Sequence, residues 1–212
     1  FTGSIPLSIC NSTSINTLAL DGLQSATSCR RALFPSSLNS IVASGLYTIA
    51  NPLTGGVPAC LFEIPALTTL HLSGNGLTGS ISNTIRVAPT LTDLSLSHNK
   101  LTGTIPSALL DHSWANLDLS YNVFTHSLSP ESSDVYARNA SIYLEQNRLS
   151  GRIPKVFEDV TAISMLETNL FACDAQGNDL PPHDANIDKY QCGSDTLNAT
   201  LYAWVSVAFT VL

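Results

Sequence analysis

The chain has 212 residues, of which 44% are hydrophobic and 12% are charged, and its formal net charge is −7. This length and hydrophobic content suffice for the core of one or two domains. No run of basic residues occurs, which excludes the charge pattern of a nucleic-acid-binding surface. The acidity itself is explained most simply by solubility.

The N-terminal residues hold fragments of a pattern that recurs later in the chain. "FTGSIP" at 1–6 has the form of the second half of a repeat unit. A further copy starts with three spaced apolar residues, which are Ile15, Leu18 and Leu20. Leu23 stands at the position where this copy requires asparagine. We therefore predict an insertion at 24–42 and irregular N-terminal repeats over 1–42.

Complete copies of the unit follow, with the form L-x-x-L-x-L-x-x-N-x-L-x-G-x-I-P. Asn51, followed by "PLTGGVP", stands 24 residues before Asn75, although the strand half of its unit, which includes Leu46, is degenerate. The later asparagines follow at intervals of 24, 23, 25 and 22 residues, namely Asn75, Asn99, Asn122, Asn147 and Asn169. An irregular spacing that recurs at a nearly fixed interval indicates a structural repeat.

Each part of the unit has a mechanical role. L-x-L predicts a short strand whose two leucines face the same side. The asparagine is suited to hydrogen-bond backbone groups at the following bend, so stacked copies would form a ladder. Glycine permits the bend, and proline ends the strand pairing. One coil cannot bury its own leucines, so the sequence predicts several coils stacked into a solenoid.

The unit resembles the plant-type leucine-rich repeat, over roughly 43–173 and the short tail at 1–6. The resemblance implies a right-handed α/β-type horseshoe, mostly β, with a parallel concave sheet and short 3-10 or irregular convex segments. The repeats proper are assigned to 43–172. The chain departs from the pattern where His126 replaces glycine and Ser82 replaces proline, which predicts local irregularity.

Cysteines and sequons indicate the secretory route. The sequons lie at Asn11, Asn139 and Asn198, and all three are candidate glycosylation sites. Among five cysteines, Cys10 and Cys29 flank the irregular early repeat and are expected to pair. Cys60 would then be a buried thiol. The pairings Cys10–Cys60 and Cys29–Cys60 remain open alternatives.

After Asn169 the leucines cease, and residues 173–200 are predicted to cap the solenoid. Cys173 takes the place of the repeat's glycine, and Cys192 follows 19 residues later. We predict that they pair, as in the C-terminal caps of extracellular leucine-rich-repeat proteins. "CDAQGND" offers spaced oxygen ligands but lacks the spacing and terminal glutamate of the known calcium loop. No metal or cofactor is therefore expected.

The last residues, 201–212, form an uncharged and mostly apolar run. Tyr202 and Trp204 stand at its start, where interfacial aromatic residues are common. Although a spanning helix needs about 20 apolar residues, both ends of the sequence look cut. We expect the run to be the outer part of a transmembrane helix, with Asn198 close to the membrane. The alternative is a segment packed under the cap.

Function is expected on the concave sheet, where positions between and just after the leucines point outward. Neighbouring coils lie about 4.8 Å apart, so these positions form ladders. They carry two aromatic residues, and tyrosine is enriched in binding hot spots. The candidate ligand-binding residues are His71, Ser95, His98, Asp118, Tyr121, Tyr143 and Glu145.

Catalysis is not expected, because the sequence has no H-E-x-x-H, G-x-S-x-G or phosphate-binding glycine loop. His98 beside Asp118, with Ser95 and Ser120 near, could imitate a base and its orienting acid. Serine-rich repeats produce such neighbours by chance.

The resemblance implies the extracellular domain of a membrane-anchored receptor-like protein at the cell surface, binding a protein, peptide or glycan. It extends to plant receptor-like kinases. One alternative is a secreted inhibitor of a cell-wall-degrading enzyme, similar to the polygalacturonase-inhibiting proteins. Another is a structural, adhesive or ice-binding surface protein that uses its Ser and Thr ladders.

Overall fold

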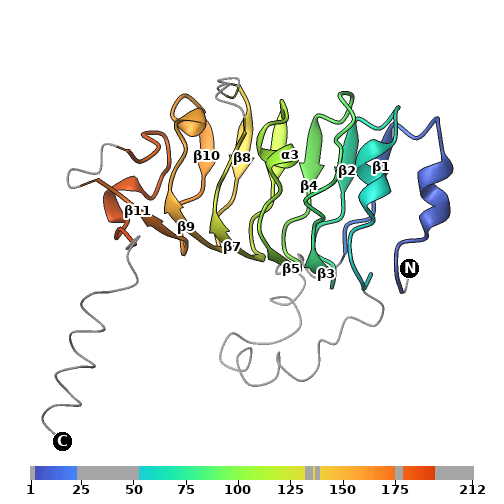
Figure 1. Cartoon of the computed structure of the whole chain (residues 1–212), viewed down its shortest axis with the longest axis horizontal. Coiled ribbons are helices and arrows are strands. Elements are labelled where there is room, and N and C mark those ends of the chain that lie inside the picture. Colours follow the sequence, from blue (N-terminus) through green and yellow to red (C-terminus); the bar gives the residue numbers. More distant parts are fainter. Residues whose placement is uncertain (1–2, 23–52, 132–135, 137–138, 175–178, 194–212) are drawn as a thin grey trace, which may run out of the picture.

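The computed structural model describes residues 3–22, 53–131, 136, 139–174 and 179–193. In this part of the chain, two parallel sheets run along the solenoid, and the coils follow one another from the blue to the red end of Figure 1. The six-stranded sheet consists of β1 (Thr17–Ala19), β2 (Thr69–His71), β4 (Asp93–Ser95), β6 (Asn116–Asp118), β8 (Ser141–Tyr143) and β10 (Ala162–Ser164).

The second sheet has five strands, one for each successive return of the chain. They are β3 (Thr78–Ser80), β5 (Lys100–Gly103), β7 (Val123–Ser127), β9 (Arg148–Arg152) and β11 (Leu170–Ala172). Four short helical turns lie between strand segments, namely η1 (Leu7–Asn11), η3 (Ala59–Glu63), α3 (Ser107–Leu110) and η4 (Lys155–Phe157), and η5 (Ile187–Lys189) follows the last strand. The predicted leucine-rich-repeat solenoid, mostly β with short 3-10 segments, is confirmed.

The core is a continuous stack of leucines between the two sheets. Leu70, Leu94, Leu117 and Ile142 occupy equivalent places in neighbouring strands, and all are fully buried. Because each coil covers the apolar face of the previous one, the burial is shared between coils rather than made within any one of them.

Five buried asparagines form the predicted ladder along this core: Asn75, Asn99, Asn122, Asn147 and Asn169. The Nδ2 group of Asn99 donates to the Leu96 carbonyl of its own coil and to the Leu72 carbonyl of the preceding coil, both at 2.9 Å. Its Oδ1 atom accepts the Leu77 N–H at 3.2 Å. Each asparagine therefore ties two coils together at the bend after the strand.

The first described coil is divided in the sequence. Strand β1 pairs directly with β2, so that Thr17 lies opposite Thr69. The return half of this coil comes from 53–56, where Thr78 N–H donates to the Gly55 carbonyl at 2.8 Å. The chain therefore leaves this coil after Gly22 and returns at Leu53. The strand expected before Asn51, including Leu46, and the insertion expected at 24–42 lie outside the described residues.

Two disulfides join described residues. The predicted Cys173–Cys192 bond is confirmed. The expected pairing of Cys10 with Cys29 is wrong, since Cys10 bonds Cys60, which is therefore no free thiol. The helical turns η1 and η3 belong to adjacent coils and contact each other, so stacking brings the two Cα atoms to 5.7 Å. Cys29 lies outside the described residues.

His126 stands in a column that glycine otherwise occupies. It has a φ of 70°, close to the 76° to 82° of Gly79, Gly103 and Gly151 at equivalent bends. The repeat backbone thus holds its shape at this departure from the sequence pattern.

No helix among the described residues has the length and apolar character needed to cross a membrane. The terminal run 201–212 and Asn198 lie outside the described range.

Candidate functional site

The outward surface of the six-stranded sheet carries all seven predicted site residues, and we call this surface the ladder face. Four of the seven lie side by side at one level of the sheet, in the order His71, Ser95, Asp118 and Tyr143. The other three follow the strands of their coils by two or three residues, namely His98, Tyr121 and Glu145. The structure therefore brings the predicted residues together on one surface.

A polar cluster fixes the side chains at the β2 and β4 end of the ladder face. The Nε2 atom of His71 lies 3.0 Å from Oδ1 of Asp93. The same carboxylate oxygen accepts a hydrogen bond from Nδ2 of Asn116 at 2.8 Å. Asp93 is thus hydrogen-bonded to Asn116 on one side and lies beside the His71 imidazole on the other, so that its carboxylate is next to both neighbouring strands.

Serines hold Asp118 in the centre of the ladder face. Ser95 Oγ donates to Oδ2 of Asp118 at 3.2 Å, and Ser120 Oγ donates to Oδ1 at 2.6 Å. Ser95 also lies 2.6 Å from the hydroxyl of Ser73 and is 9% exposed. Ser95 therefore positions Asp118 rather than offering its own hydroxyl to a ligand.

An aromatic pair projects beside this cluster. The rings of His98 and Tyr121 are stacked, with centroids 4.2 Å apart and planes at 11°. Both residues have left-handed backbone, with φ values of 54° and 53°. Tyr121 is 43% exposed, which is uncommon for a large hydrophobic side chain among the described residues. The pair presents a flat aromatic surface to solvent.

Carboxylates surround the Tyr121 ring. Partial burial, followed by the charges of Glu167, Glu145 and Asp118, raises the pKa of the Tyr121 phenol. Burial is also the main cause that raises the pKa of Glu145, with smaller contributions from Asp118 and Asp184. The potential on this part of the ladder face is therefore negative.

Sequence reasoning missed Glu167, although it belongs to the same surface. Its Oε1 atom accepts a hydrogen bond from Nε2 of Gln146 at 2.8 Å. In the last coil, Asn169 bonds the carbonyl of Met165, four residues earlier, whereas Asn99 bonds Leu96, three residues earlier. The last coil therefore has one extra residue between its strand and its asparagine, which hides the repeat position of Glu167 when the strands are aligned. Aligning the units on Asn169 places Glu167 two residues before the asparagine, as Glu145 is before Asn147.

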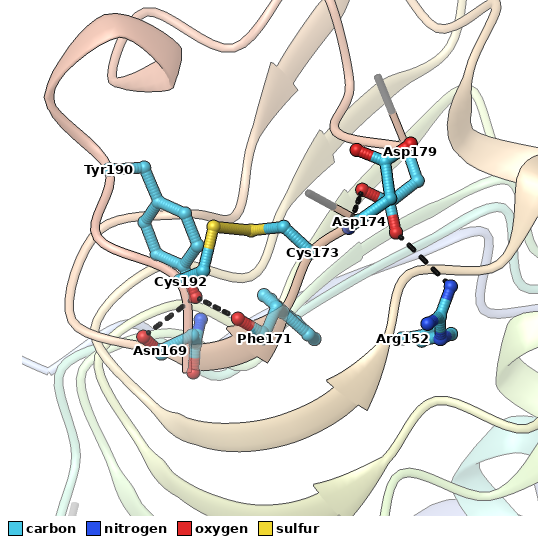
Figure 2. Close-up of a disulfide and its surroundings, with 8 residues drawn as sticks. All are labelled: Arg152, Asn169, Phe171, Cys173, Asp174, Asp179, Tyr190 and Cys192. Carbon is cyan, nitrogen blue, oxygen red and sulfur yellow. Dashed lines mark hydrogen bonds and ion pairs between the residues drawn. A yellow bond between two sulfur atoms is a disulfide. The ribbon is translucent and has the colours of Figure 1, made fainter. Parts of the chain in front are cut away.

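The cap closes the solenoid beyond the last strands (Figure 2). The hydroxyl of Tyr190, next to the Cys173–Cys192 bond, donates to the carbonyls of Asn169 and Phe171, both at 3.1 Å. Asp184 is 2% exposed, and its Oδ2 atom accepts the N–H groups of Met165 and Leu166 at 2.7 and 3.0 Å. This carboxylate thus caps the backbone that follows β10.

A second polar contact holds the cap to the second sheet. Nη1 of Arg152, in β9, lies 3.7 Å from Oδ2 of Asp179, while Oδ1 of Asp179 accepts the Asp174 N–H at 2.8 Å (Figure 2). The cap is therefore anchored on both sheets.

An open hollow of about 310 Å³ lies between the last coil and the cap. Glu167 and Thr168 form the wall that continues the ladder face, and Lys189 and Tyr190 form the wall on the cap. The remaining lining includes Leu166 and Asn186. The ladder face thus leads directly into a recess of side-chain size.

Within the described residues, no group of three or more His, Cys, Asp or Glu side chains is arranged to hold a metal ion. The sequon residues Asn11 and Asn139 are both exposed.

The comparisons with known proteins concern the repeats and the fold. The leucine-rich-repeat family model matches residues 66–87 and 90–111. No curated protein matches the chain in sequence.

Solved structures of proteins with different functions share the fold of this chain. The Arabidopsis receptor kinase HAESA ectodomain, solved with an IDA peptide hormone, is 24% identical to this chain with a TM-score of 0.59. The match covers 84% of this chain and 26% of the HAESA chain. The plant peptide hormone receptor RGFR1, solved with RGF2, has 23% identity and a TM-score of 0.57, covering 81% and 23%. A plant ice-binding protein has 21% identity and a TM-score of 0.53, covering 90% and 58%.

The chain thus spans about a quarter of the length of these two receptor ectodomains. The chain therefore contains leucine-rich repeats at 66–87 and 90–111, and its solenoid has the fold of the plant receptor ectodomains.

Proposed function

We propose that the chain is an extracellular ligand-recognition domain of a membrane-anchored, receptor-like protein, and that the ladder face binds a protein, peptide or glycan. The observation that carries the proposal is the exposed His98–Tyr121 stack beside Asp118, on the bends that follow β4 and β6 and precede the ladder residues Asn99 and Asn122. A surface that is already ordered loses little conformational entropy when a ligand binds.

Binding, rather than catalysis, fits the contacts of the residues that could imitate a catalytic triad. Asp118 accepts hydrogen bonds from Ser95 and Ser120, and the His98 ring lies on Tyr121. An aromatic surface next to oriented polar groups is common at the centre of protein-binding sites.

Location outside the cell is supported by the two disulfides and the exposed sequons at Asn11 and Asn139. Membrane anchoring is proposed from the apolar sequence at 201–212, and reading the coding sequence past Leu212 tests it. A further apolar stretch followed by Lys or Arg supports anchoring. A stop or a polar stretch there contradicts it and favours the secreted inhibitor.

Binding to the ladder face is tested with variants on the two sheets, screened against a random peptide library and a glycan array. Tyr121→Asn with Tyr143→Ala alters the ladder face, and asparagine tolerates the left-handed backbone at 121. Thr78→Ala with Thr102→Ala, on β3 and β5 of the second sheet, is the matched control. Loss in the first variant alone supports the proposal. Loss in the control alone places binding on the second sheet and contradicts it.

A further inference from the structure

We propose that the ligand is an extended peptide with a Lys or Arg side chain over Tyr121 and, about three residues away, an uncharged side chain in the hollow at the cap. This inference rests on the proposed function, because it names the chemistry of the ligand for the same ladder face.

Charge is distributed unequally between the surfaces of the solenoid. Five acids lie on the strands of the six-stranded sheet or on the residues that follow them: Asp21, Asp93, Asp118, Glu145 and Glu167. None of the described residues on this ladder face is Lys or Arg, whereas Lys100 lies on β5 and Arg148 and Arg152 lie on β9. The ladder face is therefore complementary to a cation.

The acids around Tyr121 lack a basic partner within the described part of the chain. Asp118 is held by serine hydroxyls, and Glu167 is held by the amide of Gln146. Oε2 of Glu145 is buried without a hydrogen-bond partner among the described residues. Like charges that converge without a counter-charge disfavour one another, so a bound cation would relieve this repulsion.

Tyr121 supplies a specific seat for that cation. Its ring is stacked on His98 on one side and is 43% exposed. A guanidinium or ammonium group over a tyrosine face is attracted by the ring as well as by nearby carboxylates. Arg is the better fit, because its planar group stacks on aromatic rings and pairs with carboxylates through two parallel hydrogen bonds.

The hollow at the cap fits an uncharged side chain of the peptide, unlike the seat over Tyr121. Its charged lining consists of one acid and one base, Glu167 and Lys189, and its lining also includes Leu166 and Tyr190. A side chain of either charge would find no net attraction between this acid and this base and would lose hydration, so an aliphatic, aromatic or amide side chain fits the hollow better.

The spacing between the two seats follows from the sheet. Tyr121 N–H donates to the Glu145 carbonyl, and Gln146 N–H donates to the Glu167 carbonyl, so Tyr121 and Thr168 are two coils apart. Two strand spacings amount to about 10 Å, which an extended peptide covers in about three residues. One peptide can therefore reach both seats.

The test selects a random dodecapeptide library against the 212-residue chain with its disulfides formed. We expect Lys or Arg to be enriched three residues from an uncharged side chain. Affinity for the selected peptides should fall about tenfold or more in Glu145→Gln/Glu167→Gln and should weaken with added salt. The matched control, Glu131→Gln/Glu158→Gln, makes the same change in net charge away from the ladder face and should bind as the unmodified protein does.

The outcomes separate this inference from the proposed function. Peptides without basic enrichment that still lose binding in Tyr121→Asn overturn the cationic ligand and leave peptide binding on the ladder face intact. Peptides that bind all of these variants equally overturn both, as does the absence of any selected peptide or glycan. Basic peptides that lose affinity equally in the control variant reflect net charge alone and overturn the two-seat site.

Discussion

His98 and Tyr121 stack with their ring centroids 4.2 Å apart, although neither residue is in a regular strand and both have left-handed backbone. The equivalent positions in other coils are Gly74, Gln146 and Thr168, which share this backbone with φ values of 57° to 67°. The column is therefore set by the repeat, and the side chains on it are free to differ between coils.

The left-handed backbone of this column predicts which substitution of Tyr121 leaves the protein more stable. Tyr121→Ala and Tyr121→Gly both remove the ring, but glycine avoids the cost of left-handed backbone, about 1 kcal/mol. We expect the glycine variant to be the more stable by about that amount in urea unfolding. Tyr143, in regular strand β8, is the control, where alanine should be the more stable. The same order of stability at both positions would contradict the argument.

Much of the fold could be predicted from the spacing of apolar residues and asparagine. The strands around Leu70, Leu94, Leu117 and Ile142 follow from it, because each unit must stack to bury its leucines. The left-handed backbone at Tyr121 could not be predicted, since Gly74 is the one glycine among the described left-handed positions of this column and the others carry side chains. The Cys10–Cys60 bond could be kept only as one of two open alternatives, because a unit-like sequence at Asn51 hid the return of the first coil at Leu53.

We expect Asn99 to be among the residues whose substitution lowers the free energy of unfolding most. Asn99→Ala would leave the Leu72 and Leu96 carbonyls and the Leu77 N–H buried without their partner. We expect the free energy of unfolding to fall by about 3 kcal/mol. Asn83→Ala, at an exposed position, should change it little. Equal effects would show that the ladder does not clamp the coils.

The cap depends on Asp184. Asp184→Ala would remove the acceptor for the N–H groups of Met165, Leu166 and Asn186, and we expect a loss of about 3 kcal/mol. Chemical denaturation measures this loss, with the exposed Asp188→Ala as the control. A cap that tolerates Asp184→Ala would have to satisfy these groups in another way.

The buried carboxyl group of Glu145 predicts that the stability of the protein depends on pH. Burial raises its pKa in the folded protein, so the folded state holds the proton more tightly than the unfolded chain. The stabilising contribution is present below the unfolded pKa and is lost as the pH rises through the folded pKa. Glu145→Gln should therefore have a higher Tm than the unmodified protein at pH 7, and the difference should disappear below about pH 4.

The control for this comparison is Glu158→Gln, because Glu158 is exposed. Its Tm difference from the unmodified protein should change little over the same pH range. A Tm difference for Glu145→Gln that persists at low pH would assign the effect to packing instead of ionisation.

Disulfide mapping tests the arrangement of the first coils. Digestion without reduction should yield one linked peptide pair that contains Cys10 and Cys60 and another that contains Cys173 and Cys192. Reduction should release each pair in mass spectrometry. A linked pair of Cys10 with Cys29 would contradict the contact between η1 and η3.

The divided first coil offers a place to graft a foreign sequence. Gly22 N–H donates to the Ser73 carbonyl, and Gly76 N–H donates to the Leu53 carbonyl, so the two ends of 23–52 are fastened to one four-residue segment of the next coil. The entropy cost of closing a loop between fixed ends grows only slowly with its length. A tag, epitope or small domain exchanged for 23–52 would thus leave the contacts of Gly22 and Leu53 in place, and with them the register of β1 on β2.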